Sequence, residues 1–199
     1  MRRTLLFSTM AFFALLVAIL IPSVFYINPF TGILATKTKE LLANKFYIDS
    51  FFIHVYIGGI ALGIGWLNFV DKLRSKYIQL HRIIGRIYVL TFLITAITSL
   101  VVSYHAYGGI VSQVGFVAVG IAAIFTTLMG FASIVNGNVK SHQMWMRYSY
   151  ACCLASVTLR IWSPVLSLVI ADELTLYGVV AWLSWVPNLL YVRFFLNKN

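Results

Sequence analysis

The feature that most constrains this chain is a series of six long apolar stretches. They cover residues 5–26, 51–70, 83–104, 110–135, 144–170 and 176–195. A helix needs about 20 mainly apolar residues to cross a bilayer, and each stretch supplies them. Because 61% of the residues are hydrophobic and only 10% are charged, a soluble domain would expose large apolar patches to water. The sequence therefore predicts an all-α polytopic membrane protein, a single integral membrane domain over residues 1–199 with six transmembrane helices.

Basic residues are distributed unevenly between the segments that connect these stretches. With the N-terminus inside, the inner segments hold Arg2, Arg3, Lys72, Arg74, Lys76, Arg82, Arg86, Lys140, Arg147, Arg193 and Lys198, and the outer segments hold Lys37, Lys39 and Lys45. Cytoplasmic loops of membrane proteins carry the excess of Lys and Arg. We therefore expect a multi-pass protein of the inner cell membrane, with both termini cytoplasmic and residues 27–48 forming an outer loop.

The net charge of +10 bears on the partners of the chain. Basic loops beside a membrane are attracted to anionic lipid headgroups. We therefore expect the lipid bilayer as a partner and no nucleic acid. All five acidic residues lie outside the spans, at Glu40, Asp49, Asp71, Asp172 and Glu173. Proton relays and cation carriers commonly use an intramembrane carboxylate, so this placement disfavours both classes.

An outer polar site is predicted from His54, His105 and Arg160. His54 lies one turn inside the second stretch and His105 closes the third stretch on the same side. Arg160 lies in the outer half of the fifth stretch, with no acid in any span to pair with it. Such a residue must meet backbone carbonyls, water in a cavity or an anionic ligand. We therefore predict an outer cavity that contains these three residues and binds a ligand or cofactor.

Small residues follow His54 along its helix and have two explanations. Gly58, Ala61 and Gly65 form a stripe on the same face as His54. Small residues permit close contact between membrane helices, and they also leave room for a flat cofactor. The sequence leaves both explanations open.

An inner site is predicted where the third and fifth stretches begin. His81 is followed five residues later by Arg86, and His142 is followed five residues later by Arg147. If these helices are neighbours, the two histidines lie close together and the surrounding cations attract phosphate or carboxylate. The alternative is that both arginines extend into the lipid headgroups. In either case the second to fifth helices are expected to form a four-helix core.

Two motifs carry a resemblance to a known family. They read His81-Arg82-x-x-Gly85-Arg86-x-Tyr88 and Lys140-x-His142-x-x-Trp145-Met146-Arg147, the second continuing to Arg160. With them the chain resembles a bacterial family of polytopic membrane proteins catalogued as domain of unknown function 2306. This resemblance covers the second to fifth helices and implies a topology but no activity. More loosely, the paired histidines near both faces are similar in arrangement to b-type cytochromes of the cytochrome b561 and ferric-reductase kind.

Two functions follow from these residues. The first is a membrane redox protein that holds haem b or a metal ion, with His54 and His105 as ligands and arginines pairing with the haem propionates. A wire of two haems is disfavoured, because 24 residues separate His81 from His105, about 36 Å of helix against roughly 30 Å of hydrocarbon. The alternative is a non-enzymatic protein whose cavity binds or carries an anionic small molecule or a lipid headgroup. Whether the chain is an enzyme stays open.

Overall fold

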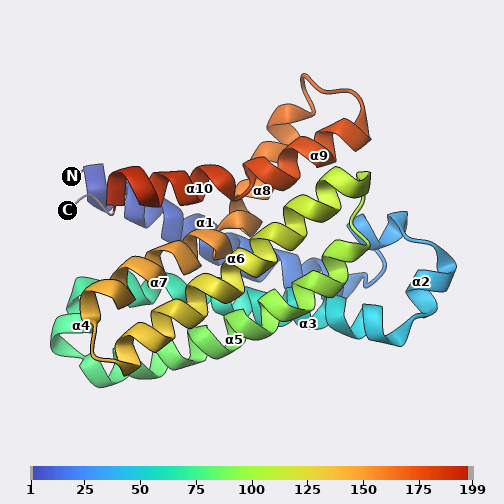
Figure 1. Cartoon of the computed structure of the whole chain (residues 1–199). Helices are drawn as coiled ribbons and strands as arrows, with labels where there is room; N and C mark the ends of the chain where they lie inside the picture. Colours follow the sequence, from blue (N-terminus) through green and yellow to red (C-terminus); the bar gives the residue numbers. More distant parts are fainter. Residues whose placement is uncertain (1, 197–199) are drawn as a thin grey trace.

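A computed structural model describes residues 2–196, and every regular element in that part of the chain is helical (Figure 1). The long helices are α1 (Arg2–Ile27), α3 (Lys45–Gly65), α5 (Ile78–Tyr104) and α6 (Gly109–Val135). Shorter helices are α2 (Lys39–Ala43), α4 (Asp71–Lys76), α7 (Val139–Cys153), α8 (Ala155–Leu166), α9 (Glu173–Leu183) and α10 (Val186–Tyr191). Turns of 3-10 helix span Gly32–Thr36 and Trp66–Phe69, and a π-helical turn, Val192–Leu196, follows α10.

Side-chain caps fix where several helices begin. The Asn44 side chain accepts a hydrogen bond from the Tyr47 amide at 3.2 Å, so α3 begins at Lys45 rather than near residue 51. Asn138 accepts from the Ser141 amide at 3.0 Å and starts α7 directly after the tight turn at Gly137. Gly137 has φ +74°, a left-handed conformation that glycine adopts at little cost.

By length and composition, five helical segments of the described chain can cross a membrane. They are Ser8–Ile27, Lys45–Phe69, Ile78–Tyr104, Gly109–Val135 and Glu173–Leu196. The prediction of an all-helical membrane protein with several apolar spans is therefore confirmed at this level.

The prediction of one continuous helix over residues 144–170 is wrong. The chain turns at Leu154, where the Val157 amide donates to the Leu154 carbonyl at 2.9 Å. The resulting α7 and α8 have 15 and 12 residues, each short of the roughly 20 that a bilayer requires. Neither glycine nor proline lies near this turn, so its cause must be sought in tertiary contacts.

Asn188 holds the break between α7 and α8 against a second break between α9 and α10. Its side-chain amide lies 3.2 Å from the Ala151 carbonyl and 3.0 Å from the Ser184 carbonyl. The Thr158 hydroxyl also donates to the Ser184 carbonyl and accepts from Asn188 at 3.2 Å. Backbone carbonyls that lose helical partners at a break are satisfied by such side chains, so these contacts stabilise both breaks together.

A buried polar cluster joins α5, α6 and α7. The Tyr88 hydroxyl lies 2.9 Å from the Ser149 hydroxyl, which lies 2.8 Å from the Thr127 hydroxyl. Close by, a Cβ added at Gly65 would lie 2.5 Å from the Tyr150 ring, so α3 approaches this cluster only because residue 65 is glycine. At Gly65, therefore, the small stripe serves close helix contact.

Candidate functional site

A cavity of about 540 Å³ lies among α1, α3, α5, α6, α7, α8 and α9, and its wall contains all three residues of the predicted outer site. Along α5 it extends from His105 inward to Phe92. This distance is 13 residues, or roughly 20 Å at the rise of an α-helix. The cavity is therefore elongated along α5, and most of its wall is aliphatic or aromatic.

His54 projects from α3 toward α5. Its Nδ1 atom lies 3.1 Å from the Thr95 carbonyl oxygen. A carbonyl oxygen only accepts hydrogen bonds, so Nδ1 carries the proton in this contact. In the neutral ring Nε2 then has a free lone pair, and in the protonated ring it is a second donor. His54 therefore has a second nitrogen left for a ligand in the cavity whose wall it lines.

Arg160 lies on α8, near enough to His54 for an electrostatic interaction. Its Nη1 atom donates a hydrogen bond to the Ser156 carbonyl at 2.6 Å. No other hydrogen bond joins the Arg160 side chain to the described residues. A guanidinium has five N–H donors, so most of its capacity remains. Among the described residues that line the cavity there is no Asp or Glu. Arg160 thus has no protein counter-ion among the described residues of the cavity wall.

The break at Leu154 places two helix ends at the cavity wall. The last turn of α7, with Cys152 and Cys153, and the first turn of α8, with Ala155 and Ser156, both line the cavity. The positive end of the α8 dipole therefore meets the negative end of the α7 dipole, and the Val157 amide is already bonded to the Leu154 carbonyl. Sequence reasoning missed this feature, since it depends on a helix end that no local signal marks.

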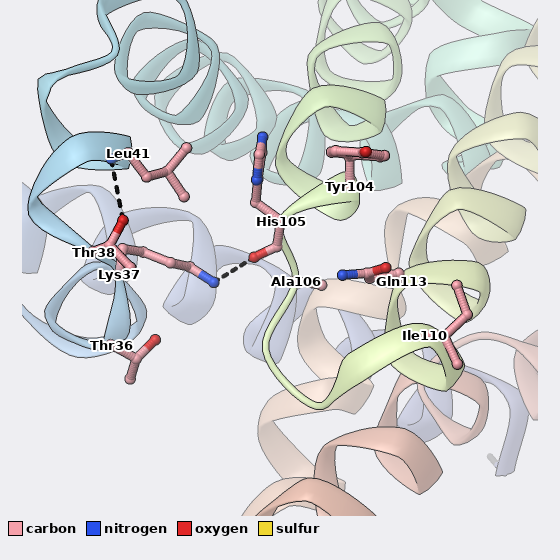
Figure 2. A pocket seen from close by; sticks show the side chains of 9 residues that line it. All are labelled: Thr36, Lys37, Thr38, Leu41, Tyr104, His105, Ala106, Ile110 and Gln113. Carbon is pink, nitrogen blue, oxygen red and sulfur yellow. Dashed lines mark hydrogen bonds between the residues drawn. The ribbon is translucent and has the colours of Figure 1, made fainter.

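His105 and Lys37 line the end of the cavity next to the C-terminus of α5. The Lys37 ammonium donates to the His105 backbone carbonyl (Figure 2). The His105 ring packs edge-on against Tyr47 and Tyr104, with ring centroids 5.2 and 5.0 Å apart. Burial lowers the pKa of the Lys37 ammonium below its ordinary value. The sequence presented Lys37 only as a loop charge, because its partner is 68 residues away.

The family can now be stated from a comparison with known proteins. Residues 51–196 match the model of the family described as Predicted membrane protein (DUF2306). The chain belongs to this family. No curated protein and no solved structure matches the chain. The match confirms the resemblance carried by the two motifs, whereas the looser likeness to b-type cytochromes stays a prediction.

The DUF2306 match includes the helices that carry His54, His105 and Arg160, while α1 and Lys37 lie before it. The cavity of this chain is therefore built mainly from the family region. Its wall is completed by the segment that precedes residue 51.

The geometry of this DUF2306 protein does not favour His54 and His105 as two ligands of one metal. Two nitrogens bound to one ion at about 2.1 Å lie within roughly 4 Å of each other. His54 contacts Thr95, which is ten residues, about 15 Å of helix, before His105. In the described part of the chain no group of three or more His, Cys, Asp or Glu side chains is placed to hold a metal ion.

Two of the four predicted inner residues of the DUF2306 region bond to the protein backbone. The His142 Nδ1 atom lies 2.8 Å from the Gly130 carbonyl, and Arg147 donates to the Leu196 carbonyl at 2.8 Å. The Nδ1 atom of His81 is buried without a partner among the described residues, and Arg86 is exposed. His142 is close enough to His81 to act on it electrostatically. None of these side chains lines the cavity, and anion binding at this end stays a prediction.

Proposed function

We propose that this DUF2306 protein binds an anionic amphiphile, a molecule with one carboxylate or phosphate group and a slender apolar body, in the outer cavity. The observation that carries the proposal is the position of Arg160. It lines a cavity with one backbone carbonyl as its partner and no acid on the described wall. An unpaired charge inside a membrane is costly, and an anionic group would remove that cost through charge-assisted hydrogen bonds.

The shape of the cavity supports the apolar part of the ligand. Its length of roughly 20 Å along α5 exceeds what a small inorganic anion needs. Phe51, Phe92 and Val119 contribute to an apolar wall, while His54 and Arg160 supply donors on one side. Binding sites of this kind combine a mainly apolar lining with a few convergent polar groups.

Binding of dodecyl phosphate tests the proposal. The protein is placed in phosphatidylcholine nanodiscs, and retention of the radiolabelled probe is corrected for that of empty nanodiscs. We expect wild-type protein to bind dodecyl phosphate, dodecanol to compete weakly, and inorganic phosphate not to compete. Competition by inorganic phosphate alone would identify a site for the free anion. Equal retention by wild type and Arg160→Gln would overturn the proposal.

A single haem b is the second candidate, and the contact of His54 favours it. Histidines that bind metals typically donate their other ring N–H to a backbone carbonyl, as Nδ1 of His54 does to Thr95. Nε2 of His54 would be one axial ligand, and Arg160 would pair with a propionate. An absorption spectrum of protein produced with added haem tests this candidate. A Soret band that is lost in His54→Ala would support it, and a colourless protein would exclude it.

We also propose six membrane crossings in the inner membrane, with both termini cytoplasmic and α3, α5, α6 and α7 forming the core. In this topology α7 and α8 together make the fifth crossing. Both chain ends lie at one end of the molecule and α2 lies at the other (Figure 1). The basic residues favour the chain ends as the cytoplasmic side. Labelling with an impermeant thiol reagent should reach Lys39→Cys in intact cells and Lys76→Cys only after permeabilisation.

A further inference from the structure

A second pocket, of about 480 Å³, lies directly outside the cavity. It is lined by Thr36, Thr38, Leu41, Tyr104, Ile110 and Gln113, with Lys37, His105 and Ala106 (Figure 2). The last three residues also line the cavity that contains Arg160. The two spaces therefore share one wall, and the contact between Lys37 and His105 lies in that wall.

The polar contact between Lys37 and His105 differs from the apolar packing that also holds the loop of residues 27–48. Leu34 is fully buried in an apolar cluster with Phe25, Tyr47 and Phe51. Three residues later, the flexible Lys37 side chain donates a hydrogen bond to the His105 carbonyl. Lys37 forms no ion pair within residues 2–196, where the salt bridge joins Arg74 to Asp71. The apolar packing of Leu34 has no polar partner to exchange. The hydrogen bond between the Lys37 ammonium and a neutral carbonyl can be exchanged for a stronger one with an anion.

We propose that the outer pocket is the entrance to the cavity, and that Lys37 is its gate residue, exchanging the His105 carbonyl for the anionic group of an incoming amphiphile. The identity of the ligand rests on the proposed function, but the passage itself does not. An amphiphile in the outer leaflet presents its headgroup at the membrane surface, which is the level of α2 and the end of α5. From there Arg160 offers the next cation along the cavity wall.

Two reporter cysteines test the passage without any ligand. Ser103 is buried and lines the cavity but not the outer pocket, and Gln113 lines the outer pocket but not the cavity. Each is changed to cysteine in a Cys152→Ala, Cys153→Ala background. A membrane-impermeant thiol reagent is then added from the outer side, and Lys37→Met is compared with Lys37→Arg.

We expect Lys37→Met to increase the labelling rate of Ser103→Cys about tenfold or more, because a hydrogen bond from a charged group is lost. Lys37→Arg should leave this rate near that of the parent, and Gln113→Cys should react equally in all backgrounds. Equal labelling rates of Ser103→Cys in the parent protein and in Lys37→Met would overturn the proposal that Lys37 is the gate residue. A parallel increase at both reporters would also overturn it, since that result indicates general loosening.

Adding dodecyl phosphate separates this inference from the proposed function. If the Lys37 effect persists but the probe neither protects Ser103→Cys nor binds, the gate stands and the proposed ligand class fails. If the probe binds through Arg160 but Lys37 has no effect on labelling, the binding function stands and the gate is wrong.

Discussion

The two halves of the predicted fifth helix, α7 and α8, place similar residues in opposite surroundings. On α7, Met146, Ser149 and Tyr150 are buried in the core, and Arg147 bonds to the C-terminal backbone. On α8, Val157 is buried, and Arg160 lines the cavity described above. The surroundings of an arginine on these two helices therefore depend on what its helix packs against.

The break at Leu154 produces this difference. Before it, α7 packs on α6, and after it, α8 packs on α9. The departure of α8 from α6 leaves space that small residues such as Gly120 and Ala123 border. The comparison teaches that the cavity follows from a change of helix partner as well as from small side chains.

The largest expected effect separates the two arginines. Arg160→Gln should weaken dodecyl phosphate binding by about thirtyfold or more, since losing a buried charged partner costs about 2–5 kcal/mol. The same change should leave thermal stability equal or higher, because it removes a buried cation. Arg147→Gln should instead lower the unfolding temperature and preserve binding, because its partner is backbone. Loss of dodecyl phosphate binding in both variants would contradict the contrast between Arg160 and Arg147.

The next effect concerns the break that separates α7 from α8. Asn188→Leu should destabilise the protein by about 1–3 kcal/mol, because the Ala151 and Ser184 carbonyls lose a half-buried donor. Unfolding in mixed detergent and SDS measures this change. Thr158→Val, which keeps Asn188 but removes the hydroxyl that bridges to Ser184, should cost less. A neutral Asn188→Leu would mean that the breaks do not depend on this side chain.

A smaller effect distinguishes the two inner histidines. His142→Phe should cost about 1 kcal/mol of unfolding free energy, the typical net value of one hydrogen bond, here the one to Gly130. His81→Leu should be neutral or stabilising, because it removes a buried nitrogen without a partner among the described residues. If both histidines instead bind an anion, the two variants should reduce phosphate binding equally, and the contrast between the two ends of the molecule would disappear.

The smallest effect lies at the start of α9, outside both regions. Hydrogen bonds from the Thr175 hydroxyl and amide, at 2.6 and 2.8 Å, hold the pKa of the Asp172 carboxyl below its ordinary value. Because the folded-state pKa is the lower one, the stabilisation is present above the unfolded value of about 3.9 and is lost as the pH falls through the folded value. Asp172→Asn keeps the cap but removes the charge.

The unfolding temperature of Asp172→Asn should therefore lie slightly below that of wild type at pH 6. The difference should shrink as the pH falls below 4, where the wild-type carboxyl becomes protonated. A difference that grows in acid would contradict this account.

The sequence by itself determined the class of the protein and the residues worth examining. Apolar length is a local property, so five spans were predicted close to where they lie, although caps such as Asn44 moved their ends. His54 and Arg160 were recognisable because a polar residue in an apolar stretch is costly wherever that stretch folds. The family motifs likewise depend only on spacing along one chain.

Only the tertiary structure decided the break, the cavity and its outer wall. Leu154 has no glycine or proline beside it, and the side chain that satisfies the nearby Ala151 carbonyl comes from Asn188, 37 residues later. In the same way, Lys37 is placed by His105, 68 residues later. Local patterns report the cost of burying a polar group, but the partner that removes this cost is chosen by packing between residues distant in sequence.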